Sequence, residues 1–299
     1  MKVGFIGLGH MGGPMCRNII KGGHEVVVHD LSEAAVKACV ELGGTAGGSV
    51  ANVAGQVEVV MTSLPMPKDV EAVALGPGGI GENAKPGTIY VDLSTNSPAM
   101  IRKIEGELAA KDIVTLDGPV SGGVLGAEKA TIAIMVGGDK AAFDRCMPVF
   151  ESFGKTIVHT GELGTGCIAK LVNNMIAFIN MTAGAEGLML GVAAGIDPVI
   201  LDEIIRNSSG NSMGYRGVAK SALERDFAPA FTVDLAYKDL RLAMELADGL
   251  DMPLLLGPQA HNVMRMARSK DQGGENVTAI MKVYEEIMDQ QVGPAGKNK

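Results

Sequence analysis

The chain contains no tryptophan, and aromatic residues make up only 4% of its 299 residues. Lysine and arginine are outnumbered by aspartate and glutamate, 26 to 34, which leaves a net charge of −8, and the sequence has no block of basic residues. Binding to nucleic acid depends on clustered positive charge and on aromatic side chains that stack on bases. The composition therefore argues against a nucleic-acid surface, and a small anionic ligand has to be met by a few local cations.

Cysteine is also scarce. The four cysteines are widely separated, and none belongs to a C-x-x-C pair or lies at metal-ligand spacing from a histidine: Cys16, Cys39, Cys146 and Cys167. We expect reduced, mostly buried thiols and no metal site. The first residues lack the charged segment, apolar segment and cleavage site of a secretory signal, because Met1 leads directly into an expected strand. We therefore expect a cytoplasmic protein.

Glycine, by contrast, is abundant, with 41 residues, and three glycines stand at G-x-G-x-x-G spacing after the apolar run Lys2 to Ile6. In a strand–turn–helix unit, Gly7 allows the tight turn, Gly9 lets the backbone approach a pyrophosphate, and Gly12 lets the helix pack closely on the sheet. The N–H groups at the start of the helix favour the anion. The segment predicts a dinucleotide site formed by Gly7, Leu8, Gly9, His10, Met11 and Gly12.

A second apolar run, Glu25 to His29, ends in Asp30, where a carboxylate would accept hydrogen bonds from the ribose of an adenosine. Leu31 follows, and no arginine stands directly after Asp30 to pair with a 2′-phosphate, which the carboxylate would repel. NAD is therefore the predicted cofactor, in preference to NADP. The alternative role of Asp30 is to cap the helix that begins near Ser32, although Ser32 could equally act as this cap.

Short β-rich runs alternate with helical patterns in the first half of the chain. This alternation predicts βαβ units and an α/β fold with a mainly parallel, doubly wound sheet of the Rossmann type. The expected strands cover residues 3–6, 25–29, 57–64, 88–92, 113–117, 131–136 and 156–159. Ligands bind at the carboxyl ends of such strands. The segments of interest therefore follow the strands, and we expect Leu64, Pro65 and Thr95 to contact the cofactor.

The second half shows no further strand pattern. An apolar segment at 165–195 is followed by helical patterns near 198–207, 233–250, 254–268 and 277–288, which predicts an all-helical C-terminal domain. The apolar segment could suggest a membrane span, but its lysine, asparagine and glutamate residues are expensive in lipid. We expect instead a helix buried between domains or subunits, no membrane partner, and a homodimer or homotetramer. The predicted domains are 1–162 (dinucleotide-binding), 163–292 (helical, for substrate and oligomerisation) and 293–299 (a flexible tail).

Two polar residues of the apolar segment suggest chemistry. Lys170 and Asn174 are four residues apart and so share one helix face. Burial, or a nearby cation such as Lys238, would lower the pKa of Lys170 toward the range in which it can exchange a proton at neutral pH. The alternative is a surface lysine whose stem covers apolar surface. Lys238 and Asp239 could likewise form an ion pair on a solvated helix face.

Residues 117–123, Asp-Gly-Pro-Val-Ser-Gly-Gly, follow an expected strand. Their glycines leave backbone N–H groups beside the hydroxyl of Ser121, an arrangement that suits a carboxylate. The alternative is a Pro/Gly turn in which Ser121 acts as a cap. On the first interpretation, Ser121, Gly122 and Gly123 bind the substrate.

Four motifs in this order resemble those of the β-hydroxyacid dehydrogenases, and the resemblance covers nearly the whole chain: residues 4–15, 117–123, 164–174 and 238–240. The resemblance implies that Lys170 is the catalytic acid/base and that Asn174 orients the substrate. It also implies that residues 121–123 hold the substrate carboxylate, that Thr95 lies near the nicotinamide, and that Lys238 contacts cofactor or substrate. Gly118 stands where the family commonly has alanine, which is a small departure.

The resemblance implies a metal-independent hydride transfer between NAD and a small 3-hydroxy acid of the 3-hydroxyisobutyrate, glycerate or 2-(hydroxymethyl)glutarate type. One rival is an imine reductase of the same architecture, which usually lacks the lysine. Another is a phosphosugar dehydrogenase, which would need an Arg/Lys cluster around Ser121. A third is a module that binds NAD without turnover, because fold alone does not fix function. We expect substrate side-chain specificity to lie between two helices, in residues 208–216.

Overall fold

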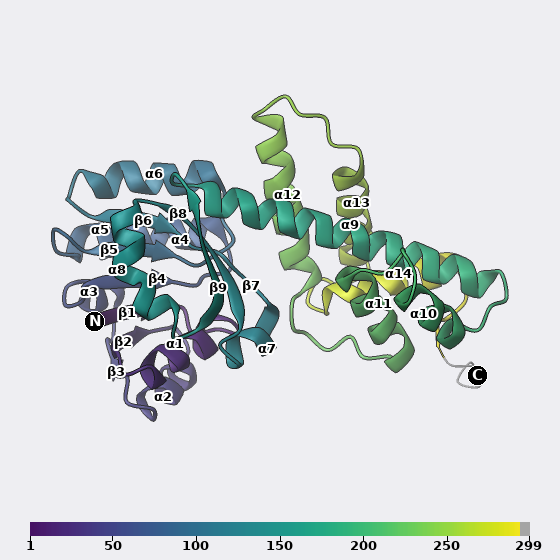
Figure 1. Cartoon of the computed structure of the whole chain (residues 1–299), viewed down its shortest axis with the longest axis horizontal. Coiled ribbons are helices and arrows are strands. Elements are labelled where there is room, and N and C mark those ends of the chain that lie inside the picture. Colours follow the sequence, from purple (N-terminus) through teal and green to yellow (C-terminus); the bar gives the residue numbers. More distant parts are fainter. Residues whose placement is uncertain (294–299) are drawn as a thin grey trace. The chain divides into compact units, whose positions relative to one another are not determined.

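The computed structural model describes residues 1–293 (Figure 1), and the chain divides into two compact units between Lys170 and Leu171. This junction lies inside helix α9 (Thr165–Ala193), whereas the sequence predicts a boundary at 162/163, just before that helix. The predicted tail lies outside the described residues, except for Gly293.

The first unit contains a sheet with strand order β3-β2-β1-β4-β5-β6-β8-β7, and β9 pairs with β8. The strands from β3 to β6 are parallel, β8 is antiparallel to β6 and β7, and β9 is parallel to β8. The strands are β1 (Lys2–Ile6), β2 (Glu25–His29), β3 (Thr45–Ala46), β4 (Val59–Thr62), β5 (Ile89–Asp92), β6 (Val114–Asp117), β7 (Val120–Ser121), β8 (Ile132–Gly138) and β9 (Gly154–Gly161). The predicted α/β fold is confirmed, with an antiparallel element at one edge. The strand order reverses between β1 and β4, the position at which such sheets bind ligands.

Helices cover both faces of this sheet, so its central strands are apolar on both sides. On β4, Val59 and Met61 belong to one core cluster and Val60 belongs to the other. Side chains of α1, α2 and α8 fill the first cluster, and those of α3, α4, α5 and α6 fill the second. The helices are α1 (Gly12–Lys21), α2 (Glu33–Val40), α3 (Val50–Ala54), α4 (Pro67–Leu75), α5 (Ile80–Asn83), α6 (Pro98–Ala109), α7 (Gly123–Glu128) and α8 (Lys140–Phe150).

All four cysteines are buried and none forms a disulfide, as the sequence predicts. Three of them, Cys16, Cys39 and Cys146, lie in the first core cluster. These thiols therefore act as small apolar core residues.

The described residues of the second unit form helices joined by loops and contain no strand, as expected. Its elements are most of α9, then α10 (Pro198–Arg206), α11 (Met213–Glu224), α12 (Val233–Asp248), α13 (Leu256–Arg268), the 3₁₀ turn η1 (Val277–Ala279) and α14 (Ile280–Met288). Figure 1 shows α12 and α13 running side by side, in agreement with their extensive packing. The interpretation of 208–216 as a connection between helices is wrong for 213–216. Ser212 caps α11 by accepting a hydrogen bond from the backbone N–H of Tyr215, so these residues form the first turn of a helix.

Among the described residues, α9 is the one helix long and apolar enough to cross a membrane by length and composition alone. One side of α9 packs into the core of the second unit, where Phe178, Ala185 and Leu188 are buried. This packing is typical of a core helix in a folded domain.

Candidate active site

The segment from the end of β1 to the first residue of α1 contains two crowded glycines and an open one. Gly7 has a φ of +92°, and a Cβ built there would lie 2.3 Å from the carbonyl oxygen of Ser63. A Cβ on Gly12 would lie 1.9 Å from the carbonyl oxygen of Gly7, so helix and loop touch. A Cβ on Gly9 would meet no atom within 4 Å. The backbone is therefore exposed at Gly9, where the pyrophosphate of a dinucleotide has to approach, and the loop fits that group.

Asp30 directly follows β2 and holds this loop in place through a hydrogen bond. Its Oδ2 accepts a hydrogen bond from the backbone N–H of Leu8 at 2.5 Å, and its Oδ1 accepts one from that of Ser32 at 2.7 Å. Ser32, not Asp30, caps helix α2, because the Ser32 hydroxyl accepts from the backbone N–H of Ala35. The remaining lone pairs of the Asp30 carboxylate can accept hydrogen bonds from ribose hydroxyls.

Leu64, Pro65 and Thr95 follow β4 and β5, which are the next strands beyond β1 in the sheet. The backbone N–H of Leu64 donates to the Ser94 hydroxyl at 2.9 Å, so the two strand ends are joined. These residues therefore lie at the same edge of the sheet as the glycine loop.

A buried carboxylate, which was not identified from the sequence, joins the ends of β4 and β5 at this edge of the sheet through hydrogen bonds. Asp92 accepts hydrogen bonds from the Thr62 hydroxyl at 2.9 Å, the Asn96 amide at 3.0 Å and the backbone N–H of Ser94 at 3.1 Å. Burial raises the pKa of Asp92. Since two of its donors flank Thr95 in the chain, Asp92 fixes the conformation of the segment that presents Thr95.

Ser121 ends the short strand β7, and the two residues after it have positive φ angles, +136° at Gly122 and +67° at Gly123. Gly122 is the N-cap position of α7 and no side chain caps this helix, so Ser121 is not a cap. Helix α7 packs on α1, where the Asn18 amide donates to the carbonyl of Ala127 at 2.7 Å. The segment that carries Ser121 is thereby tied to the helix that follows the glycine loop.

The first turn of α9 is held by Asp117, a second buried carboxylate, at the end of β6. Its Oδ1 accepts from the backbone N–H of Gly164 at 2.7 Å, and its Oδ2 accepts from that of Cys167 at 2.6 Å. Burial raises the pKa of Asp117. A Cβ on Gly166 would lie 2.3 Å from the carbonyl oxygen of Met135, so this turn also packs closely against β8. Lys170, itself buried, follows on the second turn of the helix.

In the second unit, Asn174 is part of a buried polar cluster. The Asn174 amide donates to Asp239 Oδ2 at 2.7 Å, and the Asn173 amide donates to Asn174 Oδ1 at 3.0 Å. The Lys238 ammonium lies 3.2 Å from Asp239 Oδ1. Lys238 and Asp239 are only 5% and 1% exposed, so their ion pair is not on a solvated face.

From the sequence, Asp239 was expected only as a surface ion-pair partner of Lys238, with no part in the site. Its position was a detectable signal, because Asp239 lies beside the apolar stripe formed by Ala236, Leu240 and Ala243 on α12. A carboxylate at such a position needs partners. Asn174 and Lys238 supply them.

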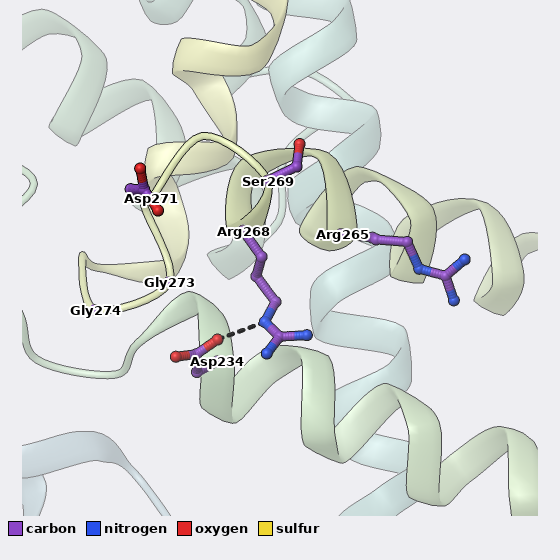
Figure 2. Close-up of a pocket in the computed structure, with 7 residues that line it drawn as sticks. All are labelled: Asp234, Arg265, Arg268, Ser269, Asp271, Gly273 and Gly274. Carbon is purple, nitrogen blue, oxygen red and sulfur yellow. Dashed lines mark hydrogen bonds and ion pairs between the residues drawn. The ribbon is translucent and has the colours of Figure 1, made fainter.

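None of the predicted site residues lines the hollow of about 530 Å³ that Figure 2 shows in the second unit. Arg268 points at Asp234 and bonds its carboxylate at 2.5 Å, whereas Arg265 extends away from it. The lining residues are Asp234, Arg265, Arg268, Ser269, Asp271, Gly273 and Gly274. Within residues 1–293, no group of three or more His, Cys, Asp or Glu side chains is arranged to hold a metal ion.

Comparison with known proteins gives two family matches that together span most of the chain. Residues 2–161 match the NAD binding domain of 6-phosphogluconate dehydrogenase, and residues 164–284 match the NAD-binding domain of NADP-dependent 3-hydroxyisobutyrate dehydrogenase. The chain is 41% identical over 288 residues to 2-(hydroxymethyl)glutarate dehydrogenase of Eubacterium barkeri, covering 96% of each chain. It is 38% identical to 3-hydroxyisobutyrate dehydrogenase of Pseudomonas aeruginosa, covering 94% of this chain and 98% of the relative.

A solved structure of Mycobacterium tuberculosis 3-hydroxyisobutyrate dehydrogenase with L-serine is similar to this chain, with a TM-score of 0.86 and 30% identity. The match covers 94% of this chain and 98% of the other. Both the sequence and the fold therefore match over nearly the full length.

Proposed function

Since the chain belongs to the β-hydroxyacid dehydrogenase family, whose members are NAD(P)-binding oxidoreductases acting on CH–OH donors, we propose that it interconverts a small 3-hydroxy acid and its semialdehyde. The observation that carries the proposal is the buried cluster of Asn174, Lys238 and Asp239, in a chain that also has an open glycine loop and a buried Lys170. The names of the relatives indicate substrates of the 3-hydroxyisobutyrate and 2-(hydroxymethyl)glutarate type.

We propose NAD as the preferred cofactor. The bound nicotinamide supplies the hydride acceptor for oxidation and the hydride donor for reduction. Asp30 receives the adenosine ribose and repels a 2′-phosphate, while the 96% exposed Leu31 offers that phosphate no positive charge. The loop 7–12 holds the pyrophosphate, and Leu64, Pro65, Thr95 and Lys238 contact the cofactor.

Lys170 is the proposed acid/base: it takes the hydroxyl proton during oxidation and returns it during reduction. An amide carries two N–H donors, and Asn174 uses one of them on Asp239. The second is left to orient the substrate hydroxyl. Asp239 is therefore a positioning residue, because it fixes the Asn174 side chain.

The substrate carboxylate binds the Ser121 hydroxyl and the backbone N–H groups of Gly122 and Gly123. The positive φ angles at these glycines turn the chain sharply after Ser121, and Ser121 is not used as a helix cap. Hydrogen bonds to an anion are roughly twice as strong as neutral ones. A carboxylate in this position anchors the substrate for hydride transfer.

We further propose that the enzyme acts in the cytoplasm as a homodimer or homotetramer. The support for self-association is the number of large apolar side chains that remain exposed on the second unit, among them Leu190, Ile200, Met213 and Leu255. Exposed apolar patches of this kind mark interaction surfaces.

The test is an absorbance assay of NADH with a panel of 3-hydroxy acids, including L-serine, together with the methyl ester and amide of the best acid. Removing the anion weakens a charge-assisted interaction worth roughly 1.5–3 kcal/mol, so kcat/KM should fall about 10- to 150-fold. Ser121→Ala should lower activity on the acid and narrow this gap. Equal rates on acid and ester would contradict the carboxylate anchor and favour a general alcohol or imine reductase. Cofactor binding without turnover on any acid would favour a binding module.

A further inference from the structure

The outer face of α9 carries an apolar stripe that the second unit itself leaves uncovered. Val172, Ile176 and Leu190 are 41%, 52% and 72% exposed, and Ala183 between them is also exposed. These positions differ by four, seven and seven residues, close to whole helical turns, so they lie in one row. From Leu171 to the end of the helix, Glu186 is the one ionisable residue, and its carboxylate accepts a hydrogen bond from the Tyr284 hydroxyl.

Gly187, one helical turn after Ala183 and beside this row, has no reason within its own chain to be glycine. A Cβ on Gly187 would meet nothing within 4 Å, and its φ is not positive. By contrast, a Cβ on Gly184 would lie 3.0 Å from the backbone of Tyr215, and one on Gly191 would lie 2.3 Å from the Leu201 side chain. Glycine weakens a helix interior relative to alanine. A small residue at an open position permits another helix to approach closely.

We infer that this row is the contact between two copies of the chain, whose α9 helices cross in antiparallel orientation with the twofold axis beside Ala183. This inference rests on the proposed self-association and names its surface. In an antiparallel pair, Leu190 of one copy meets Ile176 of the other, since both lie seven residues from Ala183. The small residues Ala183 and Gly187 occupy the centre of the crossing, where the helices are closest.

The charge pattern selects this orientation. About the same axis, Glu186 faces Asn180 of the second copy, whereas a parallel pair would place Glu186 opposite its own equivalent. Like charges at such a contact are unfavourable. An isologous contact of this kind also closes after two copies.

A single helix crossing covers less than the roughly 800 Å² per partner that a stable dimer buries. Helix α10 supplies further apolar surface, because it packs on α9 through Leu201 and leaves Val199, Ile200 and Ile204 about half exposed. We therefore expect α10 to take part in the same contact.

Cysteine cross-linking tests the orientation. The four native cysteines are buried, so an introduced surface cysteine reports alone. With Ala183→Cys, mild oxidation should convert most of the protein to a disulfide-linked dimer. Ile176→Cys and Leu190→Cys should not cross-link singly, because equivalent residues lie about 20 Å apart in an antiparallel pair. The double variant should cross-link. Gly106→Cys, at an exposed helix position on α6, is the control and should stay unlinked.

A second pair of variants tests the close approach without threatening the fold. Gly187→Gln adds a side chain where the chain has open space, and we expect at least a tenfold rise in the dissociation constant of the oligomer by light scattering and sedimentation. Gly106→Gln makes the same change on α6, where a Cβ also meets nothing within 4 Å, and should leave that constant unchanged.

The outcomes separate the inference from the proposal on which it rests. A parent protein that stays monomeric at micromolar concentration overturns the proposed self-association itself. An oligomeric parent in which Ala183→Cys does not cross-link, or in which the single Ile176→Cys and Leu190→Cys variants do, overturns only the antiparallel α9 contact. Flotation of the parent with phospholipid vesicles, abolished by Gly187→Gln, would assign the row to a membrane instead.

Discussion

Lys170 is the residue on which the proposed chemistry depends most. Lys170→Ala removes the acid/base, and we expect turnover to fall at least about a hundredfold, which is the usual range for this role. NADH binding, measured by fluorescence titration, should change little, because Lys170 is not proposed to hold the cofactor. The matched control is Lys155→Ala, at an exposed position on β9, and it should retain full activity. A Lys170→Ala enzyme with near-normal kcat would remove the lysine from the mechanism.

Cofactor preference depends on two adjacent residues, Asp30 and Leu31. Asp30→Ser with Leu31→Arg removes a repulsive charge and adds a partner for the 2′-phosphate, so the ratio of kcat/KM for NADP to that for NAD should rise. Leu31→Arg alone keeps the two hydrogen bonds that Asp30 makes to the backbone, and should give only part of the change. An unmodified enzyme that has the higher kcat/KM with NADP would show that Asp30 has been misinterpreted.

Several residues of the proposed site could be identified from the sequence because they belong to local motifs. The glycine loop, Asp30 and the spacing of Lys170 and Asn174 are all of this kind. The partners of these residues were not predictable. Asn174 meets Asp239 across 65 residues, and Asp117 meets Gly164 across 47. Only the folded chain brings such pairs together.

At the scale of elements, the sequence predicted the strands with strong apolar runs and the long helices. It missed β3 and β7, which have two residues each and therefore no usable period. It also missed α11, because glycines and serines interrupt the apolar pattern of that helix. Its N-cap, Ser212, was the available signal.

The start of α9 depends on Asp117, and we expect Asp117→Ala to lower the free energy of unfolding by roughly 2–5 kcal/mol, because two backbone N–H groups lose their acceptors. Asp117→Asn keeps one carbonyl oxygen and should cost less. Urea denaturation measures both. Asp144→Ala removes an exposed ion pair with Lys140, and should cost about 1 kcal/mol or less. A loss for Asp117→Ala no greater than that for Asp144→Ala would contradict the anchoring role.

The contact between α12 and α13 includes a buried histidine. His261 stacks on Tyr237 with ring centroids 4.1 Å apart, and its Nε2 has no hydrogen-bond partner among the described residues. Burial lowers the pKa of His261, and the nearby arginines Arg265, Arg241 and Arg268 act in the same direction.

The folded pKa of His261 therefore lies below the unfolded value of about 6.5, so between these two values the unfolded chain binds more protons. Stability of the second unit should fall as the pH drops from about 7 through this window. Thermal unfolding between pH 8 and pH 5 measures the slope. His261→Phe should reduce it, and an unchanged slope would exclude His261 as its source.

At the scale of the whole molecule, alternating patterns predicted two parts of different architecture, and the observed fold confirms this. The junction was harder to locate. Helix α9 continues through it from Thr165 to Ala193, so neither a turn nor a change in composition marks the transition at Lys170. The exposed apolar surface from which self-association is proposed was visible in the sequence only as apolar content, because exposure is a property of the folded chain.

The three glycines of the first loop should respond differently to selection. Any side chain at Gly7 or Gly12 collides with a backbone carbonyl, so substitutions there should reduce the amount of folded protein. Gly9 faces open space, so Gly9→Ala and Gly9→Val should accumulate normally in cells and yet fail to turn over substrate. A saturation library scored once for abundance and once for activity would separate the two kinds of glycine. The abundance score and the activity score should diverge at position 9. Because folding does not require glycine there, only selection for catalytic activity can preserve it.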